Sequence, residues 1–451
     1  MLAGRAAVVV VYTAAMCMNG LDSTIVNPAL YRIAEDFGRP VSAANAVETA
    51  FLVGLAVGLP VAGWFGDRCG VKRVFLAALT AFTLTSALCA AAPGLGPLAA
   101  ARAVQGVAGG LLTPVGMTLL FRAFAPHERS RLGRILIVPT ALMPALGPPL
   151  GGFLTEHLSW HWLFLVNLPI GAAAVLTGVL GLPRAEEPAA GRFDTTGFLL
   201  ATPGLGLLTY ALGFGPAHGW ASPGVALGGL LGLLLLALAV RHQRRAPEPL
   251  VDLRLLADRT FGPATWLALL TSAGLMGALF VLPLLYQAAL GASALDAGLS
   301  VFPEALGLMA ASHLVDRLLP RLGPRRLTVP ALLLAALVLA ALGFAENPWA
   351  VRALMFAVGL VLGTAVLTVQ IVGFAEIPPP AMGRAMGLFT ILRTLGGALG
   401  IAATAALLAA LAPDAGSPTP YRLALLLTAT LTAAATLLAT RLPRELTLDP
   451  S

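Results

Sequence analysis

The first apolar segment of the chain contains a carboxylate. Residues 6–30 are long enough to cross a bilayer, because about 20 apolar residues span the hydrocarbon core, yet they include Asp22 and the amides Asn19 and Asn27. Inserting a carboxylate at membrane depth costs about 2.5–3.5 kcal/mol, and such groups generally face a polar cavity. We therefore predict that Asp22 takes up and releases protons in a protein-lined cavity that Asn19 and Asn27 also line. The alternative is that Asp22 caps a broken helix end or lies at the membrane interface.

A second apolar segment, residues 98–121, contains a cation. Arg102 lies inside it, with Gln105 one turn further along. A cation beside a carboxylate favours the charged form, whereas burial favours the neutral form. Movement of Arg102 relative to Asp22 would therefore switch the proton affinity of that carboxylate, and Gln105 is expected in the same cavity. The alternative is that Arg102 only donates hydrogen bonds to backbone carbonyls of neighbouring helices.

Three further charged residues occupy apolar segments. Glu48 and Glu304 are candidates for a second protonation site or for binding a cationic substrate. Glu304 is predicted near the middle of its segment, whereas Glu48 could instead lie in water at the mouth of the cavity. Arg393 is a further candidate for the cavity wall, where it could pair with an acid.

The composition identifies the class of protein that must position these residues. Of the 451 residues 58% are hydrophobic and 11% charged, with a mean hydropathy of +0.87, whereas soluble proteins have about 25% charged residues. Only helices and closed barrels span lipid, and alternating strand patterns are absent, so we predict an all-α polytopic membrane protein. The apolar segments that we interpret as about 14 transmembrane helices are residues 6–30, 43–65, 74–92, 98–121, 134–154, 162–181, 195–214, 222–240, 261–286, 295–314, 328–345, 350–374, 385–411 and 421–440.

The basic residues indicate the orientation. With the N-terminus in the cytoplasm, 22 of the 28 Arg and Lys residues fall in cytoplasmic segments and four outside. Cytoplasmic loops carry such an excess, so both termini are expected in the cytoplasm and the protein in the cell (inner) membrane. The net charge of +7 then reflects topology rather than a nucleic-acid partner. Three scattered cysteines predict no disulfide or metal site.

A short charged motif occurs twice, each time in the predicted loop after an apolar segment. Residues 63–73 run from a small residue through Asp-Arg to Gly and a basic pair, and residues 312–326 repeat this with extra residues inserted. A carboxylate here can accept from helix N-terminal amides or pair with an arginine, so we predict a conformational latch. The alternative is that the charges only enforce topology. The latch residues are Gly63, Asp67, Arg68, Gly70, Arg73, Asp316 and Arg317.

The two copies lie eight apolar segments apart, whereas two six-helix halves would place them six apart. We therefore expect two six-helix bundles with two extra central helices. The predicted domains are residues 1–183 and 255–451 for the bundles and 184–254 for the linker with its two helices. Halves of this kind with a site at their interface are a transporter layout.

The fifth apolar segment is rich in proline and glycine. Proline kinks a helix because it removes a backbone hydrogen bond, and glycines four residues apart allow close helix packing. We therefore predict a bent, tightly packed helix that seals one side of the cavity. The alternative is that the glycines serve only ordinary close packing of helices. The residues of this motif are Pro144, Gly147, Pro148, Gly151 and Gly152.

Taken in chain order, these motifs resemble those of the major facilitator superfamily, and within it the fourteen-span drug–proton antiporter branch. The resemblance implies the major facilitator fold, a proton-transfer role for Arg102, and an antiporter motif in the fifth segment. The segments that carry it are residues 21–30, 63–73, 102–110, 147–152 and 160–171.

The expected function is proton-coupled export of small amphipathic molecules, drugs or secondary metabolites, by alternating access, through a monomer in the lipid bilayer. Protons are the coupling ion and no cofactor is expected. A dedicated exporter of one endogenous metabolite and a proton-coupled uptake permease are the alternatives. An enzyme is not expected, because HExxH, GxSxG and paired cysteine ligands are absent and the longest loop, residues 241–260, is too short for a soluble domain.

Overall fold

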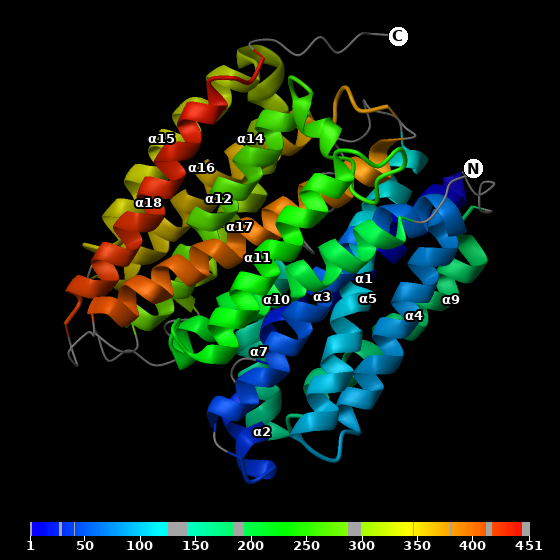
Figure 1. Ribbon diagram of the computed structural model, residues 1–451. Helices are drawn as coiled ribbons and strands as arrows, with labels where there is room; N and C mark the ends of the chain where they lie inside the picture. Colours follow the sequence, from blue (N-terminus) through cyan, green and yellow to red (C-terminus); the bar gives the residue numbers. More distant parts are fainter. Residues whose placement is uncertain are drawn as a thin grey trace.

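The computed structural model describes residues 2–443 apart from 27–28, 40, 125–141, 184–193, 287–298, 346, 379–380 and 412–416. Helices dominate this part of the chain, and it contains no strand (Figure 1). Twelve of its helices are long and apolar enough to cross a membrane. The prediction of an all-helical membrane protein is therefore confirmed.

The first half of the chain folds into one group of helices, which packs around two apolar clusters. Two short helices, α2 and α8, accompany the longer ones. The bounds are α1 Leu2–Ile25, α2 Leu30–Asp36, α3 Val41–Cys69, α4 Val71–Ala90, α5 Leu95–Ala123, α7 Met143–His157, α8 Trp162–Leu165 and α9 Asn167–Gly181.

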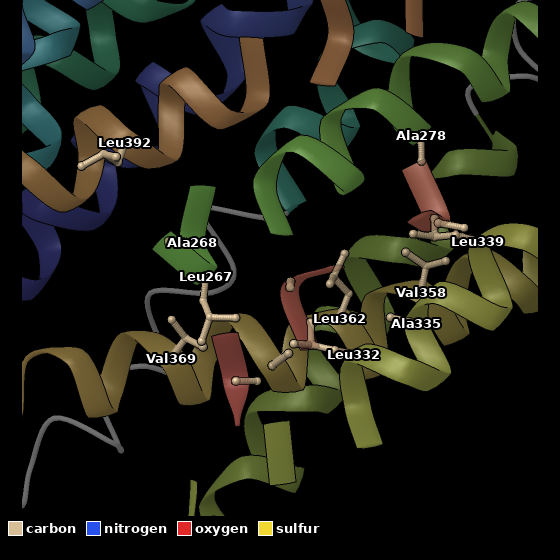
Figure 2. Packing of buried hydrophobic residues seen from close by; sticks show 14 of the residues in the cluster. Leu267, Ala268, Ala278, Leu332, Ala335, Leu339, Val358, Leu362, Val369 and Leu392 are labelled. Carbon is tan, nitrogen blue, oxygen red and sulfur yellow. The ribbon is translucent and has the colours of Figure 1, made fainter. Parts of the chain in front are cut away.

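The last part of the chain forms a second group around its own core, and Figure 2 shows part of it, with leucines, valines and alanines of several helices converging. A hairpin of two helices and a short 3₁₀ helix lie between the two groups in the sequence. The second group comprises α12 Phe261–Leu284, α14 Pro303–Leu322, α15 Pro324–Leu342, α16 Pro348–Gly373, α17 Met382–Leu411 and α18 Thr419–Ala439; the hairpin is α10 Thr195–His218 and α11 Pro223–Gln243, followed by η4 Leu253–Ala257.

The helix contacts of the two groups mirror each other. In the first group α3 packs on α5, α4 on α5 and α9, and α1 on α7 and α9. In the second group α14 packs on α16, α15 on α16 and α18, and α12 on α17 and α18. The same arrangement therefore occurs twice, and α10 and α11 have no counterparts in it. The domain boundaries drawn from the sequence, 1–183, 184–254 and 255–451, stay predictions.

The tightest contacts in both groups involve glycine. A side chain on Gly106 of α5 would strike the backbone of α3 at Phe51, and one on Gly359 of α16 would strike the backbone of α14 at Glu304. Bare glycines let helix backbones approach closely where lipid supplies no hydrophobic driving force. The pair α3–α5 in the first half and the equivalent pair α14–α16 in the second half are therefore both held in close contact by glycine.

The prediction of loops at the repeated motif is wrong. Helix α3 runs to Cys69 and α4 begins at Val71, so only Gly70 separates them, with φ +86°. In the second copy only Gly323, with φ +75°, separates α14 from α15. Glycine adopts this left-handed conformation without steric cost, so a single residue suffices to turn the chain.

The basic residues gather at one end of the molecule. Lys72 at the start of α4 donates to the Leu182 carbonyl just after α9, at 2.6 Å, and the Arg5 guanidinium lies 5.4 Å from the ring centroid of Phe124 just after α5. We call this end, which also carries Arg384 at the start of α17, the basic end. There the halves touch: a side chain on Gly63 of α3 would lie 3.1 Å from the carbonyl oxygen of Gly383.

Candidate functional site

An ion pair lies buried between α1 and α5. The Arg102 guanidinium donates from Nη1 to Oδ2 of Asp22, and both side chains are almost entirely inaccessible, at 1% and 0%. The same Nη1 reaches Oε1 of Gln105 at 2.9 Å. The predicted juxtaposition of these residues is therefore what the structure shows, and burial removes the solvent that would otherwise screen the pair.

Neutral side chains complete the coordination of the carboxylate. Oδ1 of Asp22 accepts from Nδ2 of Asn167 at 3.0 Å and from Nε2 of Gln105 at 3.3 Å. The two amides also donate to the hydroxyl of Ser86, at 3.1 Å from Asn167 and 2.7 Å from Gln105. We call Asp22, Ser86, Arg102, Gln105 and Asn167 the buried polar cluster. It joins α1, α4, α5 and α9 at one point.

Aromatic rings cover the cation. The carbon of the Arg102 guanidinium lies 4.1 Å from the ring centroid of Phe51 and 5.7 Å from that of Phe164. A cation over a ring face is stabilised by about 2 kcal/mol or more when it is desolvated. The rings also shield the buried pair from water.

Two polar atoms of the cluster have no partner among the described residues. They are Nε of Arg102 and Oδ1 of Asn167, both buried. An unsatisfied buried group costs about 1–3 kcal/mol. These atoms offer hydrogen bonds that the cluster can form when Arg102 or Asn167 moves.

Sequence reasoning missed three members of this site. Ser86, Asn167 and Phe164 lie on α4, α9 and α8, far along the chain from Asp22. The available signal was the amide of Asn167 in a strongly apolar segment, because a polar side chain at that depth needs an internal partner. Ser86 gives no comparable signal, since serine is common in membrane helices.

The comparisons with known proteins decide the family. The profile of the Major Facilitator Superfamily matches residues 12–401 of this chain. The chain belongs to the major facilitator superfamily.

Relatives and solved structures agree with this assignment. A protein named "Multidrug resistance protein B homolog" from Mycobacterium tuberculosis strain H37Rv is 32% identical over 408 residues, which are 88% of this chain and 76% of the relative. A provisionally named multidrug resistance protein MdtD from Pectobacterium carotovorum is 33% identical over 396 residues, 87% of this chain and 84% of the relative.

Two solved structures share the fold. The human organic anion transporter MFSD10 superposes with a TM-score of 0.68 at 18% identity, covering 96% of this chain and 99% of that one. The proton:xylose symporter XylE gives a TM-score of 0.67 at 14% identity, covering 96% and 94%. These likenesses establish the major facilitator fold, which the sequence predicted.

The two other predicted carboxylates of this transporter lie on α3 and α14. Glu304 is 9% exposed in the first turn of α14, and its backbone packs on Gly359 of α16; its place near the middle of a membrane span stays a prediction. Helix α14 begins at Pro303, whose fixed φ and missing N–H suit the first helical position. Glu48 is partly buried on α3, one helical turn from Phe51, which covers Arg102.

The predicted cavity amides have different outcomes. Asn19 donates to Oγ1 of Thr113 at 3.4 Å, and its own Oδ1 is buried without a partner among the described residues. A side chain on Gly109 of α5 would come within 2.7 Å of that oxygen, so α1 and α5 are in close contact here. Asn27 lies outside the described residues.

The predicted latch is a helix corner at the basic end. Arg68 is exposed at the end of α3, Arg73 lies in the first turn of α4, and Gly70 turns the chain between them. The side chain of Asp67 is not described.

In the second copy of the latch, Asp316 and Arg317 lie on α14. Asp316 precedes its corner glycine, Gly323, by seven residues, whereas Asp67 precedes Gly70 by three. The difference of four residues is about one helical turn, so Asp316 lies about one turn further along its helix from its corner glycine than Asp67 does from Gly70.

The predicted antiporter motif forms the first part of α7 and packs on α1. The carbonyl of Pro144 accepts from Oγ1 of Thr24 at 2.8 Å, and a side chain on Gly147 would clash with Thr24. Gly151 is buried, whereas a side chain on Gly152 would meet nothing within 4 Å. The side chain of Pro148 is not described. Close packing of α7 on α1 therefore depends on Gly147, which meets Thr24, two residues after Asp22 on α1.

Proposed function

We propose that this protein exports small amphipathic molecules, including drugs, in exchange for protons. The observation that carries the proposal is the buried pair of Asp22 and Arg102, held by the amides of Gln105 on α5 and Asn167 on α9. Charged residues inside transmembrane bundles are costly and mark ion and proton pathways. The names of the two bacterial relatives, which refer to multidrug resistance, support drugs as the exported class.

The coupling step is a change of charge at Asp22. A proton that enters from outside neutralises the carboxylate and weakens its attraction for Arg102. The cation then keeps Gln105 and the two rings as partners, while Asn167 and Gln105 still hold the neutral carboxyl. Because α1 and α5 each contribute one member of the pair, its opening changes how these helices pack, and the proton leaves toward the cytoplasm.

The energetic scale fits the task. A membrane potential of about 100 mV is worth about 2.3 kcal/mol per charge, and about 1.4 kcal/mol corresponds to a tenfold ratio. One proton per cycle would therefore sustain a substrate gradient of roughly 40-fold.

We propose the following membrane arrangement. Fourteen helices cross the inner membrane: the twelve apolar ones together with α7 and α14, which coincide with the two remaining predicted segments. The basic end faces the cytoplasm, and both chain termini lie on that side. The excess of Arg and Lys at this end supports the orientation.

The test is transport by the purified protein in proteoliposomes. With an imposed pH gradient and rhodamine 123 as the probe, we expect the dye to move opposite to the protons, and collapse of the gradient with nigericin to stop its accumulation. Dye movement in the same direction as the protons would favour uptake. Accumulation that survives nigericin would reject proton coupling.

A further inference from the structure

A second cation lies deep in the protein, in the other half of the molecule. Arg393 is on α17, which is 30 residues long, and about 16 Å from the start of that helix at 1.5 Å per residue. An arginine at this depth is costly unless the protein or a ligand provides a partner.

The surroundings of Arg393 place it where the two halves face each other. Its closest electrostatic neighbour is the phenol of Tyr12 on α1, in the first half. That phenol is 1% exposed and contacts the sulfur of Met117 on α5 at 3.8 Å. On the same face of α17, Gly396 and Gly400 rest on the backbone of α12, so the helix cannot turn Arg393 away toward lipid.

No acid among the described residues pairs with this guanidinium. Within the ranges that the structure describes, Arg393 makes no ion pair and no hydrogen bond, although other arginines do: Arg422 donates to the Gly343 carbonyl at 2.9 Å and Arg254 to the Ala246 carbonyl at 3.1 Å. Arg393 also keeps some accessible surface, unlike Tyr12 beside it. Its side chain is therefore not completely enclosed by the packed helices.

We propose that Arg393 binds an anionic group of the exported molecule, such as a carboxylate, sulfonate or phosphate. A guanidinium presents five N–H donors and binds such groups in a bidentate manner. The thioether of Met117, which is partly accessible beside Tyr12, supplies an apolar wall for the rest of an amphipathic anion. The inference rests on the proposed function, because it assumes that the space between the halves is the transport path.

The position of this anion site suggests how substrate and proton are kept separate. Tyr12 and Asp22 are both on α1, ten residues and about 15 Å apart. Substrate at Arg393 and a proton at Asp22 therefore do not compete for one group, and both act on the same helix.

The test is equilibrium binding of two dyes to the full-length protein in lipid nanodiscs. Fluorescein is an anion and rhodamine 123 a cation on the same xanthene ring system, and fluorescence anisotropy measures both. We expect Arg393→Gln to weaken fluorescein binding about tenfold or more, which is about 1.4 kcal/mol, and to leave rhodamine 123 binding within about twofold. Arg393→Lys is expected to retain part of the fluorescein affinity.

The control is Arg245→Gln, which removes an exposed positive charge after α11 and should change neither dye. Equal fluorescein binding by Arg393→Gln and wild type would overturn the anion site. So would an equal loss of both dyes, which would indicate a structural role, and so would the lack of saturable fluorescein binding by the wild type. Failure of the proposed function would give a different result: in proteoliposomes, dye transport would not depend on the proton gradient, whether or not Arg393 binds fluorescein.

Discussion

At the scale of single residues, several side chains together stabilise the buried carboxylate of Asp22. The carboxylate of Asp22 receives donors from three other side chains, two of which are neutral amides. A buried ion pair on its own contributes little to stability, because desolvation offsets the attraction. The amides lower that cost and keep the carboxylate in place when its charge changes.

Ser86 is the residue that aligns the two amides, and its removal gives the first prediction. In Ser86→Ala the side-chain amides of Gln105 and Asn167 each lose a hydrogen-bond acceptor. We therefore expect the free energy of unfolding to fall by about 1–3 kcal/mol and gradient-driven transport to be slower. Denaturant unfolding in detergent measures the first quantity.

The matched control for Ser86 is Ser23→Ala on α1. The hydroxyl of Ser23 donates only within its own helix, to the Gly20 carbonyl at 2.7 Å, so its loss should be close to neutral. An unchanged stability of Ser86→Ala would show that the amides find other partners.

How much of the site the sequence predicts depends on the type of residue. Asp22 and Arg102 stand out because charges in apolar segments are rare, and Gln105 follows from its spacing to Arg102. Ser86 and Asn167 contribute to the site only because α4 and α9 pack beside α1, which no local pattern indicates.

At the scale of helices, glycine decides which pairs can pack closely. The second prediction concerns α5: Gly106→Ala should destabilise the protein by about 1–3 kcal/mol or more, because the added methyl meets the backbone of α3 at Phe51. Thermal unfolding followed by circular dichroism measures the effect.

Gly96→Ala in the same helix is the matched control. A side chain at Gly96 would meet nothing within 4 Å, and alanine is the better helix former by about 1 kcal/mol. We expect this variant to be as stable as wild type or more so. Equal melting temperatures for the two variants would contradict the packing argument.

The start of α12 gives a third prediction, which depends on pH. Partial burial alone would raise the pKa of Asp258, but hydrogen bonds from the Phe261 and Thr260 amides and the Thr260 hydroxyl bring the pKa below its usual value. A carboxyl with a lowered folded pKa stabilises the protein above its unfolded pKa, about 3.9, and this stabilisation is lost as the pH falls through the folded pKa.

Asp258→Ala should therefore cost about 1 kcal/mol at pH 7, as for other N-terminal helix caps, and Asp258→Asn much less. The difference in unfolding free energy between wild type and Asp258→Ala should shrink below pH 3.9. A difference that is constant between pH 7 and pH 3 would show that the cap does not titrate.

At the scale of the whole molecule, the hairpin of α10 and α11 accompanies both halves. Helix α10 contacts α3 of the first half and α17 of the second (Figure 1). At the basic end Asp194 accepts from the Leu250 amide at 3.3 Å and lies 2.7 Å from Nε2 of His242. Asp252, two residues beyond Leu250, pairs with Arg384 at 3.8 Å, so the linker joins the hairpin to α17.

The sequence predicts this overall layout well and its details poorly. The spacing of the repeated motif indicates two extra helices, because eight segments separate copies that six would separate in a simple duplication. The extent of α3 to Cys69 and the contact of Gly63 with Gly383 were not predictable. The corner at Cys69 depends on the positive φ of Gly70, and the contact of Gly63 with Gly383 joins segments more than 300 residues apart.

The fourth prediction tests whether the halves must separate at the basic end. The ring centroids of Phe121, on α5, and Phe374, just after α16, lie 6.3 Å apart. Joining Phe121→Cys and Phe374→Cys with a short bis-maleimide, with the three native cysteines replaced by serine, should abolish transport, because alternating access requires the halves to rock.

The control cross-link joins Ala211→Cys to Gly229→Cys inside the α10–α11 hairpin, where a side chain on Gly229 would lie 3.4 Å from Cβ of Ala211. This link should leave transport intact. Full transport with the halves joined at Phe121 and Phe374 would exclude movement at this end.

The central claim is that Asp22 couples protons to substrate, and Asp22→Asn in proteoliposomes tests it most directly. Two rates are compared: accumulation of rhodamine 123 driven by a pH gradient, and exchange of labelled for unlabelled dye without a gradient. The variant should lose gradient-driven accumulation while exchange, which needs a folded protein but no proton transfer, continues. Accumulation by Asp22→Asn at the wild-type rate would contradict the account.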